Sequence, residues 1–321
     1  MMSLQNLTRN NLLFMNTKII SIKHFKMTLT LTLLSFCMSA ISVNAEDEEM
    51  SLPGSDRKYT ASQINDPFNA PDWYPDSHPE MPEVVSQGSK PAVFACASCH
   101  LTSGSGHPES SSLSGLSADY IYRQMKAYQK FQRPSVVGVM INIAKGMSDE
   151  EIKISAEYFA SLPRVQVQEV IEVDEVPLTY VNSRFMRLVA EKGENEKEAI
   201  GERLITIPDN EYRVKARDPK SRFISYVPKG SLEIGKRLVT EGKGQAVPCK
   251  TCHGIELNGT SIGPPIAGQH ASYLMSQLRD FKTGTRRGEA DPGGIMANNM
   301  KYFTDAEILA TAAYIASLKT D

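Results

Sequence analysis

The sequence has little cysteine, histidine or tryptophan, and it has no large excess of basic charge. Its 321 residues include five cysteines, six histidines and one tryptophan. The formal net charge is −2, so the chain lacks the basic surface that nucleic-acid binding needs, and we expect no nucleic-acid partner. With 41% hydrophobic and 22% charged residues, the composition is that of a globular protein, and the length suggests two domains.

The sequence also lacks an uninterrupted apolar run of the roughly 20 residues that a membrane-spanning helix needs. Residues 1–45 contain four basic residues and no acidic one. Their apolar run, from Met27 to Val43, ends at the small-x-small sequence Val43-Asn44-Ala45. This pattern predicts that 1–45 is a signal peptide, cleaved on export to the periplasm. An uncleaved membrane anchor is the alternative, which the short run disfavours.

Apart from Cys37 in that segment, the cysteines occur in two identical frames, Cys96-Ala-Ser-Cys99-His100 and Cys249-Lys-Thr-Cys252-His253. Two disulfides would not explain the histidine after each pair, and zinc would need further ligands at suitable spacing. The pattern is typical of covalent haem attachment, in which two thiols form thioethers to one porphyrin and the adjacent histidine binds iron. It predicts two haem c groups with His100 and His253 as proximal ligands.

The two frames belong to a longer internal repeat. Aligning His100 with His253 superimposes Gly115 on Gly268. It also matches further identical pairs: Ala118 and Ala271, Tyr120 and Tyr273, Gln124 and Gln277, Arg133 and Arg286. After a three-residue insertion in the second half, Ala160-Ser-Leu162 matches Ala316-Ser-Leu318. The chain therefore contains a duplicated domain.

Each copy has a methionine that is a candidate for the sixth iron ligand. Met140 aligns with Met296, and each precedes a capping box that predicts the start of the last helix, at Ser148 and Thr304. We expect both methionines in loops that reach the distal haem face. Methionine is more often core filler, and Met147 and Met300 are the nearby rivals. Methionine ligation would favour reduced iron and a high potential.

With these motifs, and with Tyr-[Phe/Ile]-Ala-Ser-Leu in both copies, the chain resembles the diheme cytochromes of the c4 type and their class I monohaem relatives. The second half is the closer match, through Cys252-His253-Gly254 and Gly263-Pro264-Pro265-Ile-Ala-Gly268-Gln269. The resemblance implies that a carbonyl of Pro264 or Pro265 accepts a hydrogen bond from His253. In the first half Ser111 and Ser112 occupy those positions, so the partner of His100 is not implied.

These patterns predict a mainly α fold: two tandem class I cytochrome c domains with a partly β or irregular insert. We expect a signal peptide at 1–45, an extended N-terminal arm with little regular structure at 46–80, domain 1 at 81–163, the insert at 164–229 and domain 2 at 230–321. Helical periodicity covers 117–131 and 148–162, and 83–87 is a short helix. Alternating residues predict strands near 164–173 and 203–207. The insert is interpreted as a linker packed across both domains, with a docking element as the alternative.

Of the other histidines, His78, His107 and His270 do not repeat between the halves, and we expect them to be surface or capping residues rather than ligands.

Two closed iron sites predict a periplasmic carrier of single electrons, either soluble or the cytochrome subunit of a redox enzyme, and not itself an enzyme. The expected partners are a redox donor and acceptor, such as a periplasmic dehydrogenase, a terminal oxidase or another cytochrome, with membrane association through the partner. The alternative is a diheme peroxidase or oxidase with one open iron site. A haem-based sensor ranks last.

Overall fold

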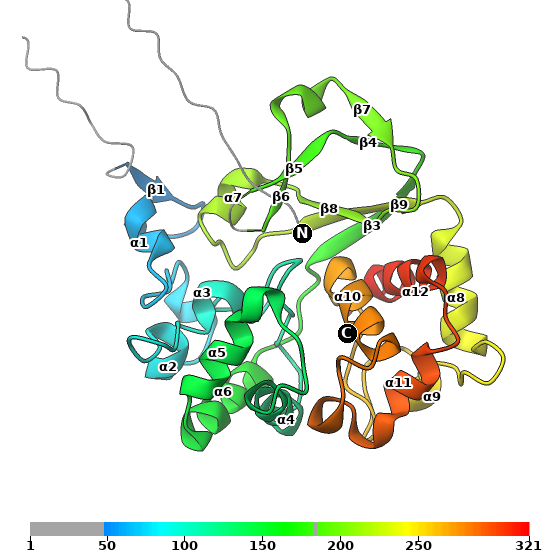
Figure 1. Ribbon diagram of the computed structural model, residues 1–321. Coiled ribbons are helices and arrows are strands. Elements are labelled where there is room, and N and C mark those ends of the chain that lie inside the picture. Colours follow the sequence, from blue (N-terminus) through cyan, green and yellow to red (C-terminus); the bar gives the residue numbers. More distant parts are fainter. Residues whose placement is uncertain (1–47, 183–184, 321) are drawn as a thin grey trace, which may run out of the picture. The chain divides into compact units, whose positions relative to one another are not determined.

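The computed structural model describes residues 48–182 and 185–320, and these fall in a single unit (Figure 1). The predicted signal peptide and Cys37 lie outside the described residues. Within the described ranges, no helix is both long enough and apolar enough to cross a membrane. The fold is mainly α-helical with several short strands, as predicted.

The helices of the first half surround a core that includes Val85, Ile121, Ile152 and Phe159. The predicted capping box is present, because Ser148 Oγ accepts from Glu151 N while the Glu151 carboxylate accepts from Ser148 N. It starts the last helix of this half, as expected. The elements are α2 (Glu83–Ser86), α3 (Ala97–His100), α4 (Ala118–Gln129), a 3-10 turn η2 (Val136–Gly138), α5 (Val139–Gly146) and α6 (Asp149–Ser161).

The second half repeats this plan and adds a longer first helix, which packs against the last one. The two helices approach so closely that a Cβ on Gly235 would lie 2.1 Å from the Ala310 carbonyl oxygen, so only glycine fits there. The elements are α8 (Ser231–Glu241), α9 (Lys250–His253), α10 (Ala271–Lys282), the 3-10 turns η4 (Gly288–Ala290) and η5 (Pro292–Gly294), α11 (Ile295–Met300) and α12 (Asp305–Ser317).

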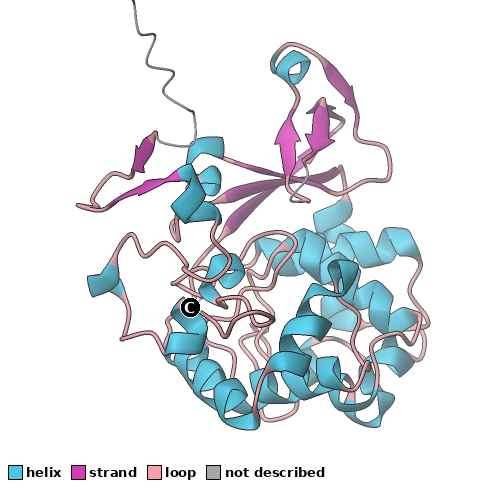
Figure 2. Ribbon diagram, turned by 60° about the vertical axis from the view of Figure 1, so that its left-hand side comes forward, coloured by secondary structure: helices cyan, strands magenta, loops and turns pink. Residues whose placement is uncertain are grey.

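The insert contains strands β3 to β9, and Figure 2 shows the strands on one side of the main group of helices. Strand β9 (Phe223–Pro228) is central, parallel to β3 (Gln168–Val173) and antiparallel to β8 (Ile205–Pro208). This sheet packs on α10 and α12. Two smaller antiparallel pairs and two short helical segments complete the insert: β4 (Glu175–Pro177) with β7 (Lys197–Ala199), β5 (Thr179–Val181) with β6 (Arg187–Val189), η3 (Glu191–Glu194) and α7 (Glu211–Lys215).

The expectation of an N-terminal arm with little regular structure is wrong. The segment forms an antiparallel pair and two helical turns: β1 (Glu49–Ser51), β2 (Lys58–Thr60), α1 (Ala61–Asn65) and η1 (Pro75–Ser77). Trp73 is buried and donates from Nε1 to the carbonyl oxygen of Ala216 in the insert, at 2.8 Å. The Pro and Asp residues of this segment favoured an extended arm, but the contact of Trp73 with the insert helps to order it.

Candidate haem-binding sites

Each Cys-x-x-Cys-His motif forms one tight helical turn. His100 N donates to Cys96 O at 2.9 Å, and His253 N donates to Cys249 O at 3.0 Å. The turn brings the two thiols and the imidazole of each motif together, as attachment to a single porphyrin requires. The four thiols are free. Across residues 48–182 and 185–320, no group of three or more His, Cys, Asp or Glu side chains could hold a metal ion.

Both motif histidines, His100 and His253, are buried and hydrogen-bonded to a backbone carbonyl. His100 Nδ1 lies 2.9 Å from Ser111 O, and His253 Nδ1 lies 2.8 Å from Pro264 O. Burial lowers both pKa values, that of His100 to about 4. A neutral ring that donates from Nδ1 has its lone pair on Nε2, the atom suited to bind iron. The family resemblance implied Pro264 or Pro265 as the acceptor for His253, and the acceptor is the Pro264 carbonyl. For His100 the resemblance implied no acceptor, and the structure shows that it is the Ser111 carbonyl.

A cavity of about 790 Å³ adjoins the first motif. Cys96, Cys99, His100 and Met140 all line it. Most of the remaining wall is apolar, and the volume lies in the range of small-molecule and cofactor sites. A covalent porphyrin therefore fits the residues present. Part of the wall comes from the insert and part from α10, including Met186, Phe223 and Tyr273.

The two candidate methionines lie on short helices, so the expectation that they lie in loops is wrong. Met140 is the second residue of α5 and Met296 the second residue of α11. Each helix follows a 3-10 turn, and a left-handed glycine, Gly138 or Gly294, precedes it. The capping boxes predicted only the helices that follow, and six to eight residues of α-helix are too short for a clear periodic signal.

The turn before each methionine is built differently in the two halves. Asp291 accepts from the backbone N–H groups of Met296 and Ala297, both at 2.9 Å, and so holds the start of α11. The matching residue in the first half is Ser135, whose buried hydroxyl has no hydrogen-bond partner among the described residues. Sequence reasoning missed Asp291, because nothing marks it as a cap for a helix that begins four residues later.

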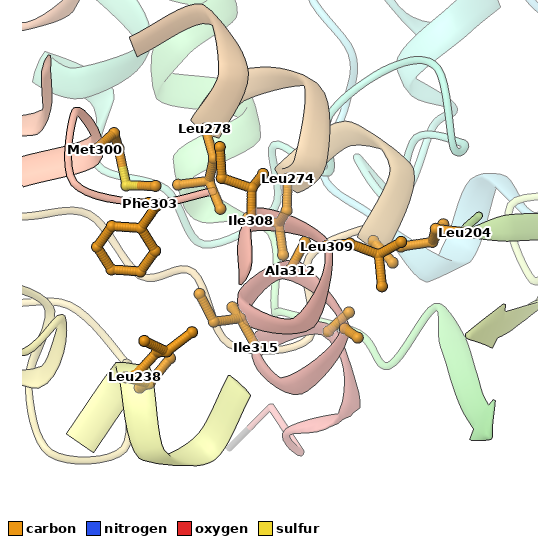
Figure 3. Packing of buried hydrophobic residues seen from close by; sticks show 14 of the residues in the cluster. Leu204, Leu238, Leu274, Leu278, Met300, Phe303, Ile308, Leu309, Ala312 and Ile315 are labelled. Carbon is orange, nitrogen blue, oxygen red and sulfur yellow. The ribbon is translucent and has the colours of Figure 1, made fainter. Parts of the chain in front are cut away.

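Met300, the rival of Met296, is a core residue with 1% of its surface exposed. It packs beside Phe303 and Leu278 (Figure 3). Met296 is only partly buried against the same cluster. In the first half, Met147 is buried in the core and also lines the cavity, while Met140 is partly buried. Burial in apolar packing favours core roles for Met147 and Met300.

His270 was expected at the surface or as a cap, and this is wrong. It is fully buried, its side chain does not cap α10, and its Nε2 lies 2.9 Å from the carbonyl oxygen of Ser105 in the other half. His107 pairs with Glu109 at 2.9 Å, and His78 pairs with Asp72 at 3.1 Å with its side chain mostly buried. None of the three lies in a cluster that could hold a metal ion.

The repeated polar residues form a buried network between the halves, a role that the sequence did not reveal. Arg133 donates to Gln124 of its own half at 3.0 Å and to Gln277 of the other at 3.0 Å. Arg286 makes the reciprocal bonds, to Gln277 and to Gln124, both at 2.8 Å. Each guanidinium also donates to a tyrosine of the opposite half, Tyr273 or Tyr120. Residues at matched positions thus face one another across a local pseudo-twofold arrangement.

Comparison with known proteins agrees with this fold and these motif turns, which define a c-type cytochrome. The family model described as cytochrome c matches residues 233–319, in the second half. The cytochrome subunit of sulfide dehydrogenase from Chlorobaculum tepidum is 34% identical over 82 residues, which are 25% of this chain and 70% of that protein. The chain belongs to the cytochrome c family, and its relatives identify it as cytochrome c4-like.

Other relatives match different shares of the chain. The thiosulfate dehydrogenase electron acceptor of Stutzerimonas stutzeri is 26% identical over 236 residues, covering 72% of this chain and 82% of that protein. Cytochrome c4 of Azotobacter vinelandii is 35% identical over 83 residues, 24% of this chain and 40% of its own length. In fold, a thiosulfate dehydrogenase structure from Marichromatium purpuratum gives a TM-score of 0.51 at 23% identity, covering 74% of this chain and 39% of that one.

These findings confirm the predicted fold class of two class I cytochrome c domains. They also identify the chain as an electron-carrying c-type cytochrome that binds haem c covalently.

Proposed function

We propose that this chain is an exported carrier of single electrons with two covalent haem c groups. The proposed axial ligands are His100 with Met140 and His253 with Met296, and the proposed attachment sites are the four cysteines. The domains are proposed at 81–163 and 230–321, with 164–229 as the insert. The observation that carries this proposal is the pair of motif turns, each with a buried histidine donating from Nδ1 to a carbonyl.

When bound, haem supplies iron that exchanges one electron at a time. The chain's own groups hold and tune it. The thioethers fix the porphyrin edge, and the carbonyl acceptors fix the tautomer and orientation of each imidazole. A thioether on the distal side closes the iron and favours its reduced form, which fits a carrier better than a peroxidase.

The buried, positively charged arginine pair is suited to bind the negatively charged propionate groups of the haems. Arg133 and Arg286 are 5% and 3% exposed, and their guanidinium groups donate to neutral Gln and Tyr side chains. The Asp280 carboxylate interacts electrostatically with both, so two buried cations share one nearby carboxylate. The Nε atoms of both have no partner among the described residues. Buried cations call for nearby anions, and haem propionates are carboxylates. We propose that the propionate edges face this network, which would bring the two haems together at the interface.

The proposed partners are a periplasmic dehydrogenase as donor and an oxidase or another cytochrome as acceptor. The names of two relatives support a donor of this kind, since one is an electron acceptor of thiosulfate dehydrogenase and another a subunit of sulfide dehydrogenase. We propose that the donor of this chain also oxidises a small sulfur compound. The chain would act either as a free carrier or as a subunit bound to its donor. Binding to a partner would also bring it to the membrane.

The test is a visible and near-infrared spectrum of the purified haem-loaded protein in both oxidation states. Two low-spin haems per chain, both with the near-infrared band of methionine-ligated ferric iron, are expected. A high-spin iron, or one that binds cyanide at once, would overturn one methionine assignment and favour the peroxidase alternative.

A further inference from the structure

One peptide group in the first half lies between the proximal histidine and a side chain of the second half. The Ser111 carbonyl oxygen accepts from His100 Nδ1 at 2.9 Å. The N–H of the same peptide group belongs to Ser112 and donates to Gln269 Oε1, also at 2.9 Å. Imidazole, peptide group and Gln269 amide therefore form one continuous chain of hydrogen bonds.

Gln269 is held in this position from several sides. Its Nε2 donates to Ser112 O at 3.0 Å, so the amide pairs with both backbone groups of Ser112 and its orientation is fixed by donor and acceptor type. The Gln269 side chain is largely buried, and Gln168 of β3 donates to its backbone carbonyl at 2.8 Å. The next residue, His270, bonds through Nε2 to the carbonyl oxygen of Ser105, which precedes Ser111 and Ser112 in the same loop. The insert and the second half together fix this acceptor.

The second half cannot form the same chain. There His253 donates to the Pro264 carbonyl, and the nitrogen of that peptide group belongs to Pro265, which has no N–H. The repeat also places Leu116, which cannot accept a hydrogen bond, at the position of Gln269. The link therefore runs one way, from the second half to the first motif.

We propose that Gln269 is a positioning residue that tunes the first haem through the Ser111–Ser112 peptide group. Hydrogen bonds in a chain polarise one another, so acceptance from Ser112 N–H makes the Ser111 carbonyl a stronger acceptor for His100. A stronger acceptor increases the electron donation of the imidazole and favours oxidised iron. The link lowers the potential of the first haem and leaves the second unaffected. This inference rests on the proposed role of His100 as an iron ligand.

The test is a redox titration of the haem-loaded full chain, with each haem followed by the NMR signals of its methyl groups. Gln269→Leu introduces the residue that stands at the matching position of the other half. We expect it to raise the reduced-to-oxidised ratio of the first haem about threefold to tenfold at a fixed applied potential. A tenfold change corresponds to about 59 mV for one electron. The ratio of the second haem should stay unchanged.

A second variant tests the route. Ser112→Pro removes the N–H and gives the first half the proline of the second, so it should shift the same haem in the same direction. If Gln269 acts through that N–H, the double variant will shift no further than either single one. Gln245→Leu is the matched control, because Gln245 is in the second half and its side chain bonds only to Tyr302 among the described residues. It should leave both potentials unchanged.

Two results would overturn the inference while leaving the proposed function intact. One is an unchanged first haem in both variants with both methionine bands present. The other is an equal shift of both haems, which would mean a general loosening of the interface. If the unmodified protein lacks one of the methionine bands, that result would instead contradict the proposed function.

Discussion

The two halves hold their motif histidines by the same hydrogen bond but build the acceptor differently. In the second half, two consecutive prolines stiffen the acceptor segment from within. In the first, serines replace them, and the segment is held from outside by Gln269 and His270. The difference teaches that one copy of a duplicated domain can lose a locally rigid segment when the other copy supplies contacts that hold that segment instead.

The methionine turns differ in the same sense. In the second half Gly293 adopts a left-handed φ of 70° without cost, and Asp291 caps the helix that follows. In the first half Val137 has a φ of 41°, which is strained for a β-branched residue, and Ser135 makes no such cap. The first half is therefore the less locally stabilised of the two around both of its proposed axial ligands.

The largest expected effect separates Met296 from Met300. Met296→Ala should remove the near-infrared methionine band of one haem, because the iron loses its sixth ligand. Met300→Ala should keep that band and lower the free energy of unfolding by about 2–5 kcal/mol, since it leaves a cavity in the core. Spectra and denaturant titrations of both variants make the comparison. The reverse pattern would mean that Met300 is the ligand.

Substitutions in the arginine network test whether each half contributes equally to the stability of the other. Arg133→Ala and Arg286→Ala should each lower the free energy of unfolding by about 1–3 kcal/mol, because buried Gln and Tyr groups lose a partner. The double variant should cost less than the two single costs together, since the residues share Gln124 and Gln277. Arg279→Ala, exposed on α10, is the control and should change stability by less than about 0.5 kcal/mol.

Exchanging the residues of the methionine turns should reverse their difference. Val137→Gly should raise the free energy of unfolding by about 1 kcal/mol, because strain is relieved and the side chain is already exposed. Gly293→Val should lower it by about 1–3 kcal/mol. A Cβ at Gly293 would meet only Ile295 Cγ1 at 3.8 Å, so the cost is strain and not a clash. Equal effects of the two substitutions in denaturant titrations would contradict this account.

The smallest expected effect concerns the capping boxes and has a defined pH dependence. The backbone N–H of Ser148, followed by the Ser89 hydroxyl, lowers the pKa of Glu151. A lowered carboxyl pKa stabilises the fold above the ordinary glutamate pKa, and this is lost as pH falls through the folded-state value. Glu151→Gln should therefore cost about 0.5–1 kcal/mol at pH 7 and a smaller amount at about pH 3. Denaturant titrations at both pH values measure it, and a constant difference would contradict the assignment.

Much of the fold was predictable because its signals are local. Hydrophobic periodicity and the pairs Ser148 with Glu151 and Thr304 with Glu307 predicted three of the longer helices. The short helices with Met140 and Met296 were not predicted, because they are too brief for periodicity and depend on the 3-10 turns before them. The order of the N-terminal arm was missed for another reason, since Trp73 finds its partner 143 residues away.

The sequence alone determined the covalent chemistry and the duplication. A thiol pair followed by histidine is a short-range pattern, and its repetition is visible without coordinates. Only the tertiary structure decided which groups surround each histidine. Gln269 and Ser112 are 157 residues apart, and the paired Arg133 and Gln277 are 144 apart. Such contacts depend on how two packed cores meet, and no local pattern of residues specifies that geometry.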